Sequence, residues 1–201
     1  MANLKKEIRV STHVGRDLLS SAAAFKTETA AVWEYVANSL QYTEPGIPPV
    51  VQVAVDASDR TISISDNGRG MSVDDLEHFF QMHGENLDRL SGRPGRGKFG
   101  TGKSAAFGIG NRLKIETCRG GIRNVVELNR KAIDRSSGED IPVTWLVRDE
   151  PSTATNGTTV TIGEIFLSRL RTNEIIEYIE RNLQAFRAQL PSVAVNDHVC
   201  S

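Results

Sequence analysis

The hexapeptide Asp66-Asn67-Gly68-Arg69-Gly70-Met71 most constrains this chain, because it lies between an alternating strand pattern and the start of a helix. Residues 61–65 alternate between polar and apolar side chains, as a half-buried strand does. Ser72 follows with an acidic residue three positions later, which is a helix-start signal. Glycine lets a ligand approach the main chain closely. The hexapeptide is therefore either an ordinary strand-to-helix turn or a site where a carboxylate meets a ligand.

Composition limits the classes of protein to consider. The chain has 201 residues, 39% hydrophobic and 24% charged, which is typical of one soluble globular domain. Its net charge of −1 gives no overall attraction to nucleic acid or lipid. Cys118 and Cys200 form no CxxC pair, so we expect neither a disulfide framework nor a cysteine metal site. With no apolar run of membrane-spanning length and no signal peptide, we expect a cytoplasmic protein without a membrane partner.

Hydrophobic periodicity and turn residues predict a mixture of helices and antiparallel strands. The end of the chain, residues 191–201, has some strand character but predicts no substantial element, so we expect the N-terminal part of a longer protein. The predicted helices cover about residues 15–25, 27–42, 73–82, 104–110 and 174–190, and the predicted strands cover about 5–12 (an edge strand), 50–55, 61–65, 112–118, 122–129, 143–147 and 158–162.

The helix predicted at 27–42 carries a polar pair beside its apolar stripe. Glu34 and Asn38 are four residues apart and so share one face. Val32, Val36 and Leu40 belong to the apolar stripe. A solvated helix edge would also explain this pair, so only its combination with other motifs indicates function.

Residues 83–102 hold six glycines and one proline, with few apolar side chains. A segment of this composition cannot pack a core, and a long glycine-rich loop within a compact domain is usually functional, so we expect a lid. His83 has no assigned role. The arginines at 89, 93 and 96 either close on phosphates or are solvated.

The stretch Gly97–Ser104 matches GxxxxGK[ST], the phosphate loop of P-loop NTPases. That loop must follow a buried hydrophobic strand, and residues 88–96 are polar and glycine-rich instead. The strands predicted after it form antiparallel hairpins, so context argues against a P-loop enzyme. Backbone N–H groups leading into a helix N-terminus would still favour phosphate.

Four motifs in order resemble the GHKL superfamily, which includes DNA gyrase B subunits, ninety-kilodalton heat-shock chaperones, histidine kinases, MutL and MORC ATPases. The chain is closest in character to the MORC, chaperone and MutL branches. The resemblance implies a Bergerat fold: an α/β (α+β) two-layer sandwich with a mixed, mostly antiparallel sheet and helices on one face. It implies a single ATP-binding domain over 1–201. The motifs are Glu34-xxx-Asn38, Asp66-x-Gly68-x-Gly70-Met71, Gly97-x-Phe99-Gly100-x-Gly102 and Gly157-Thr158.

By this resemblance, Asp66 accepts a hydrogen bond from the adenine amino group, with Gly68 beside it. Gly70 and Met71 line the base pocket. The Thr158 hydroxyl supports Asp66, usually through water.

The same resemblance assigns the phosphate end. Asn38 holds Mg²⁺ over the phosphates, and Glu34 is the general base that activates water. Backbone donors to phosphate come from the loop Lys98, Phe99, Gly100, Thr101 and Gly102. Lys103 and Ser104 depart from the residue types that are commoner there, and they either bind phosphate or, for Lys103, face solvent.

The implied function is ATP binding with slow Mg²⁺-dependent hydrolysis, used as a conformational or dimerisation switch. In the related branches, ATP closes the lid and drives dimerisation, and a following domain supplies a lysine. We therefore expect weak hydrolysis here, and a homodimer only with nucleotide. Two alternatives stay open: a histidine-kinase-like catalytic domain, although no phosphoacceptor helix precedes it, and a non-hydrolysing ATP-sensing module. The client, whether DNA, a protein or a defence partner, is not determined by the sequence.

Overall fold

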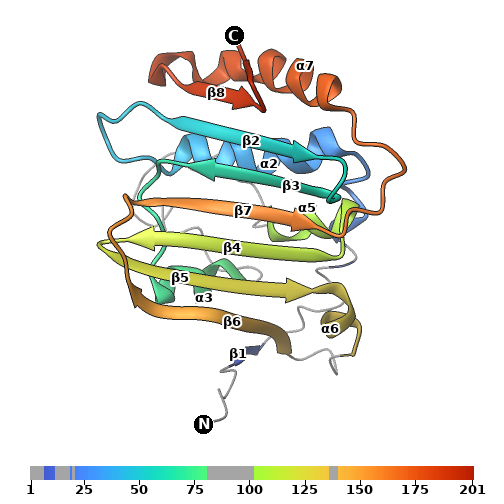
Figure 1. The fold of residues 1–201 in the computed structure, drawn as a ribbon, viewed down its shortest axis with the longest axis vertical. Helices are drawn as coiled ribbons and strands as arrows, with labels where there is room; N and C mark the ends of the chain where they lie inside the picture. Colours follow the sequence, from blue (N-terminus) through green and yellow to red (C-terminus); the bar gives the residue numbers. More distant parts are fainter. Residues whose placement is uncertain (1–6, 12–18, 20, 81–101, 136–139) are drawn as a thin grey trace.

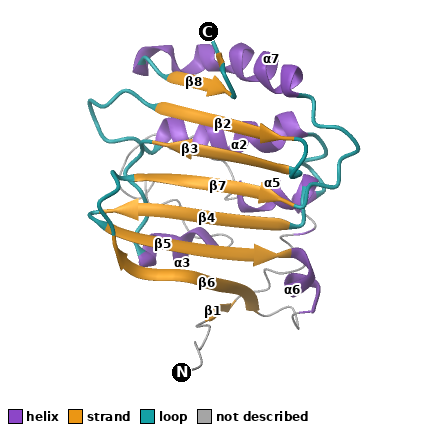
Figure 2. Cartoon of the chain, viewed as in Figure 1, coloured by secondary structure: helices purple, strands orange, loops and turns teal. Residues whose placement is uncertain are grey.

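The protein is a nine-stranded sheet with helices packed on one face (Figures 1 and 2). The computed structural model describes residues 7–11, 19, 21–80, 102–135 and 140–201. The strand order is β1-β6-β5-β4-β7-β3-β2-β8-β9. The neighbouring strands pair antiparallel except β2 and β8, which are parallel. This mixed, mostly antiparallel sheet confirms the predicted fold class.

The strands are β1 (Glu7–Ser11), β2 (Val50–Asp56), β3 (Thr61–Asp66), β4 (Arg112–Arg119), β5 (Ile122–Asn129), β6 (Asp140–Pro151), β7 (Gly157–Gly163), β8 (Ser192–Val195) and β9 (His198–Val199). The helices are α2 (Glu28–Gln41), α3 (Val73–Phe80), α5 (Gly102–Ile109), α6 (Arg130–Arg135), α7 (Thr172–Leu183) and the 3₁₀ helix η1 (Gln184–Gln189).

Alternation along the strands decides which side chains meet the helices. In β2 and β3, Val51, Val53, Ile62 and Ile64 are almost fully buried, and the residues between them are more exposed. The buried set faces the helical layer, in which α2 and α5 lie behind the sheet in Figure 1, and α7 lies at the top beside β8. One continuous core therefore fills the space between the two layers.

Helix α2 is the central element of the helical layer. Its N-cap is Thr27, whose hydroxyl accepts a hydrogen bond from the Ala30 N–H at 3.3 Å. It packs against α5, α7 and β3. The Trp33 ring makes edge contacts with Tyr178 of α7 and Phe186 of η1, with centroids 6.3 and 6.0 Å away. These contacts join α2 to the C-terminal helices.

The C-terminal part of the chain differs from the sequence prediction. The helix predicted to residue 190 ends as α-helix at Leu183, and Leu190 has a left-handed φ of 50° after η1. No substantial element was predicted at residues 192–195. These residues form β8, because Val193 and its neighbours pair in parallel with β2. The partner strand is about 140 residues away in the chain, so no local pattern predicted it. Helix α6 was also not predicted.

Two predicted segments fall partly on residues that the structure leaves undescribed. Of the helix predicted at 15–25, positions 19, 21 and 22 are helical. The predicted lid at 83–102 lies outside the described residues, except for Gly102 at the start of α5. The lid stays a prediction.

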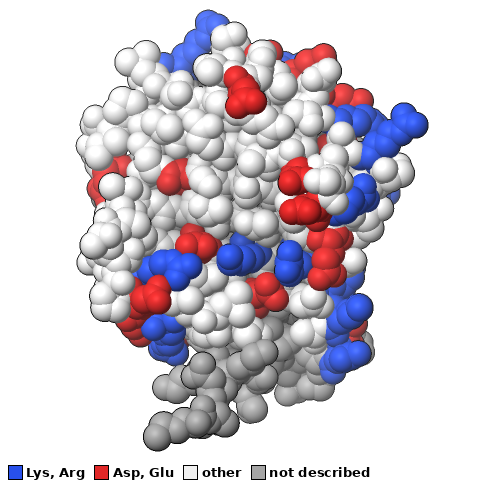
Figure 3. All heavy atoms as spheres, viewed as in Figure 1, with Lys and Arg blue, Asp and Glu red and all other residues white. Residues whose placement is uncertain are grey.

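The face of the sheet turned away from the helices is shown in Figure 3. Charged side chains gather across β4, β5 and β6, where Arg123 bonds Glu116 at 2.8 Å and Glu150 at 2.7 Å. Lys114 lies 3.6 Å from Glu116. The area over β2, β3 and β7 carries few charges. Charges of both signs are therefore interleaved on this face.

None of the helices in the described ranges combines the length and the apolar composition needed to cross a membrane.

Replacement of Ile64 by alanine should lower the free energy of unfolding by about 2–5 kcal/mol, because it opens a cavity between β3 and the helices. Ile64 is 1% exposed. The control is Ser63→Ala on the opposite face of the same strand, which should change stability by less than about 0.5 kcal/mol. Chemical denaturation of both variants measures the difference. Equal losses would contradict the assignment of the two faces.

Candidate functional site

The site is built around Asp66, the last residue of β3, which faces the helical layer. Its Oδ2 accepts a hydrogen bond from the Ser39 hydroxyl of α2 at 2.8 Å. Its Oδ1 accepts the Gly68 N–H at 2.9 Å and the Thr158 N–H of β7 at 3.1 Å. Three separate parts of the chain therefore hold one carboxylate.

Most hydrogen-bond acceptor positions of the Asp66 carboxylate are occupied by donors from the described residues. An ionised carboxylate offers about four acceptor positions, two on each oxygen. Gly68 and Thr158 occupy both positions on Oδ1, and Ser39 occupies one on Oδ2. About one position on Oδ2 is left for a donor from outside the protein. The geometry suits a ligand group that donates one hydrogen bond.

Burial raises the pKa of Asp66 above the ordinary value of an aspartate. The hydrogen bonds from Ser39, Gly68 and Thr158 act in the opposite direction, since they stabilise the charged form, but desolvation is the larger cause. A partly buried carboxylate in this balance interacts more strongly with a ligand donor than an exposed one does, because fewer water molecules compete.

Two glycines bring the turn after β3 close to other main chain. Gly70 has a φ of +67°, and a Cβ there would lie 2.0 Å from the carbonyl oxygen of Cys118. A Cβ on Gly68 would lie 2.9 Å from both Asp66 Oδ1 and the carbonyl oxygen of Tyr42. Neither position can accept a side chain without displacing its neighbours, so the glycines of the motif are required by the fold of the turn.

Neighbouring hydrogen bonds hold the same turn at both ends. Asn67 accepts the Val50 N–H at 2.8 Å and donates to the carbonyl of Pro48 at 3.1 Å. Ser72 and Asp75 form the predicted helix start, with the Asp75 N–H donating to the Ser72 hydroxyl at 3.1 Å. The turn is therefore preorganised before any ligand binds.

The main-chain N–H of Thr158 bonds the Asp66 carboxylate, and the Thr158 hydroxyl lies 3.1 Å from the hydroxyl of Thr117 on β4. The support of Asp66 by the Thr158 hydroxyl through water stays a prediction. Thr117 also accepts the Met71 N–H at 2.8 Å. Met71 is half-buried and packs on the core beside this network.

Glu34 and Asn38 lie on α2, five residues and one residue before Ser39. Both are partly buried, and Ser39, which bonds Asp66, directly follows Asn38. Burial raises the pKa of Glu34 above that of an ordinary glutamate. A carboxylate with a raised pKa is suited to proton transfer. The structure thus brings the predicted polar pair onto the helix that contacts Asp66.

The phosphate loop is described only at its end. Lys98, Phe99, Gly100 and Thr101 lie outside the described residues. Gly102 and Lys103 begin α5, with their backbone placed. Ser104 is 1% exposed, and its hydroxyl has no hydrogen-bond partner in the described structure.

Two residues of the network were not assigned from sequence. Ser39 directly follows the Glu-xxx-Asn stretch, and the sequence motif does not include it. Thr117 carries a usable signal, because Leu113 and Ile115 precede it at alternate positions and the pattern predicts a third apolar residue there. A hydroxyl at such a buried position indicates a partner that must be satisfied.

A two-layer sandwich that carries the Asp66 carboxylate, the glycine turn after β3 and the helices α2 and α5 is typical of a nucleotide-binding class of fold. The family described as histidine kinase-, DNA gyrase B-, and HSP90-like ATPase matches residues 26–158. The chain belongs to this GHKL-type family, and the matched span contains all four motifs.

One similar protein comes from Herpetosiphon aurantiacus and is named "Putative type II restriction enzyme HgiDII". It is 28% identical over 121 residues, which cover 57% of this chain and 20% of that protein. The match thus spans about a fifth of the relative's length.

Replacement of Ser39 by alanine should raise the pKa of Asp66 further, because it removes a donor that stabilises the carboxylate. Carboxyl-carbon NMR titration measures the shift. Ser65→Ala is the control, since Ser65 bonds Thr159 on the other face of the sheet at 2.9 Å. An unchanged pKa in Ser39→Ala would contradict the hydrogen bond to Asp66.

Proposed function

We propose that the chain binds ATP with Mg²⁺ and hydrolyses it slowly, acting in the cytoplasm as a conformational or dimerisation switch. The observation that carries the proposal is the partly buried Asp66, with three fixed donors among the described residues and about one acceptor position that they leave unoccupied. The adenine amino group supplies a single donor of the required kind. Family membership supports ATP as the nucleotide.

In this proposal Gly68, Gly70 and Met71 line the base pocket, and Thr158 holds Asp66 through its main chain. The glycines permit the base to approach the backbone. The buried carboxylate selects an amino group over a carbonyl oxygen, because a carbonyl would meet a second acceptor.

The phosphate end of the pocket would be formed by α2 and α5. Backbone N–H groups of Gly100, Thr101 and Gly102 would donate to phosphate. The neighbouring residues that could also donate are Lys98, Phe99, Lys103 and Ser104. The free hydroxyl of Ser104 at the start of α5 supports this placement. The positive end of the helix dipole favours anions there.

Asn38 fits the role of a magnesium ligand. Mg²⁺ prefers oxygen ligands, is usually held by one or two protein groups, and takes the remainder from phosphates and water. The described residues contain no group of three His, Cys, Asp or Glu side chains able to hold a metal. A single amide oxygen beside the phosphates is compatible with that mode of binding, and bound Mg²⁺ would neutralise phosphate charge.

Glu34 would act as the general base. Its raised pKa, caused by burial, moves it toward the range in which a carboxylate can accept a proton from the attacking water. It lies one helical turn before Asn38, so both side chains serve the same end of the pocket.

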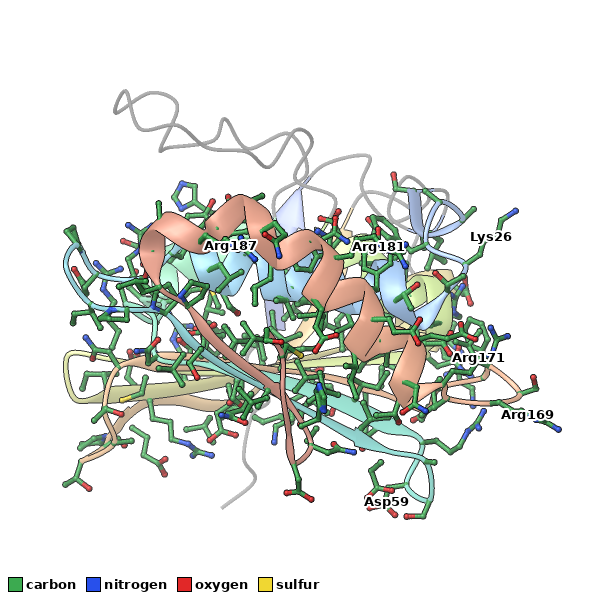
Figure 4. All side chains as sticks on the ribbon, turned by 90° about the horizontal axis from the view of Figure 1, so that it is seen from above. Lys26, Asp59, Arg169, Arg171, Arg181 and Arg187 are labelled. Carbon is green, nitrogen blue, oxygen red and sulfur yellow. The ribbon has the colours of Figure 1, made fainter. Side chains whose placement is uncertain are left out.

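The switch, the lid over residues 83–102 and the nucleotide-dependent homodimer are proposed with it. The relative's name also raises DNA as a client of a larger protein. Figure 4 shows Arg181 on α7 and Arg187 on η1, with Lys26, Arg169 and Arg171 toward one end of α7. Arg171 pairs with Glu174 at 2.9 Å, and Glu177 and Glu180 also lie on α7. This interleaving gives no support for direct DNA contact by α7.

Replacement of Glu34 by alanine should reduce ATP turnover by about a hundredfold or more while ATP still binds, because a general base is lost without a change in the base pocket. Single-turnover hydrolysis and calorimetry separate the two effects. Glu177→Ala, on the exposed face of α7, is the matched control. Unchanged hydrolysis in Glu34→Ala would remove this residue from the mechanism.

Replacement of Asp66 by asparagine should weaken ATP binding by about a hundredfold or more, since the amide cannot accept all the hydrogen bonds that converge on the carboxylate. Calorimetry measures the affinity, and circular dichroism checks folding. Asp74→Asn, exposed on α3, is the control. Normal affinity in Asp66→Asn would refute the adenine assignment.

A further inference from the structure

Thr117 is a buried hydroxyl on the helix-facing side of β4. It is 1% exposed and lies in register with Thr158 of β7. The preceding helix-facing positions of β4 are Leu113 and Ile115, which are core residues. A threonine in this row must find polar partners, because an unpaired buried hydroxyl is costly.

The partners of Thr117 join two parts of the base pocket. Its Oγ1 accepts the Met71 N–H at 2.8 Å, from the turn after Asp66. The same atom lies 3.1 Å from the Gly157 carbonyl and 3.1 Å from the Thr158 hydroxyl, both on β7. Thr117 therefore ties the turn to β7 through one side-chain oxygen.

A hydroxyl has one proton and two lone pairs, which leaves two arrangements. In the first, Thr117 donates to Gly157 and accepts from Thr158, so the Thr158 oxygen offers only lone pairs to a ligand. In the second, Thr117 donates to Thr158, and the Thr158 proton is free to be donated. The group to which the Thr117 hydroxyl donates thus decides whether the Thr158 hydroxyl is a donor or an acceptor toward a ligand.

This choice has consequences for the base, because the Thr158 N–H bonds Asp66. Adenine presents an amino donor next to a ring-nitrogen acceptor. A carboxylate beside a hydroxyl donor matches that pair of groups. The second arrangement is therefore the one that complements adenine.

We propose that Thr117 is a positioning residue for base selectivity: it holds the Met71 turn against β7 and orients the Thr158 hydroxyl as a donor. Thr117 does not itself touch the nucleotide in this scheme. The inference rests on the proposed binding of ATP.

The test compares ATP with inosine triphosphate, in which a carbonyl replaces the amino group and an N–H replaces the ring acceptor. Affinities for both, with Mg²⁺ present, are measured by calorimetry in the wild type, Thr117→Val and Thr117→Ser. Thr117→Val should reduce the preference for ATP by about tenfold, since a buried hydrogen-bond partner is lost. Thr117→Ser keeps the hydroxyl and should retain the preference.

A double-mutant cycle tests whether Thr117 acts through Thr158. Thr158→Val should lower the preference for ATP, and the double variant should lose little more than the larger single loss. Thr159→Val is the matched control, because Thr159 bonds Ser65 on the other face of the sheet. Its preference should equal that of the wild type.

The outcomes separate the two levels of inference. Loss of affinity by the same factor for both nucleotides in Thr117→Val, or fully additive effects in the cycle, would overturn the positioning role and leave ATP binding intact. A wild type that binds neither nucleotide would overturn the proposed function, and this inference with it. If circular dichroism shows that Thr117→Val does not fold, Thr117→Cys takes its place; an undiminished preference there would also overturn the role.

Discussion

A carboxylate partly removed from water must be compensated, and the site depends on how Asp66 meets that requirement. A charge without partners at this position would lose part of its solvation with nothing in exchange. The compensation comes from the Ser39 hydroxyl and from two main-chain N–H groups, one in the turn and one in β7. These donors belong to segments far apart in the chain. The end of β3, the end of α2 and the start of β7 must therefore meet for any one of them to be satisfied.

This convergence explains how a base-reading group and a catalytic group can be linked. Ser39 follows Asn38 directly, and Glu34 lies one helical turn earlier. The hydrogen bond to Asp66 thus anchors the helix that carries both proposed catalytic side chains. Core contacts of α2 with α5 and α7 fix the rest of its position. Rigid support of this kind holds functional groups more accurately than a free loop.

Much of the fold was predictable from local patterns. The hairpin of β2 and β3, the strands β4 and β5, and the helix α2 follow alternation, helical periodicity and strong stop signals, which act over a few residues. Helix α6 is a local element that was missed, whereas strand β8 depends on a distant part of the chain. Strand β8 forms because a distant strand offers hydrogen bonds to residues 192–195, and the α-helix ends at Leu183. Neither event is visible in a window of neighbouring residues.

The candidate site also has one part that the sequence predicted and one part that it did not. By itself the sequence determined the residue types and their order: a carboxylate with glycines after a strand, a Glu–Asn pair on one helix face, and family membership through their joint occurrence. Only the tertiary structure decided that Ser39 and the main-chain N–H of Thr158 bond Asp66, and that Thr117 bonds the turn at Met71. The physical reason is that a hydrogen bond depends on distance and direction between atoms, and packing of α2, β4 and β7 sets both.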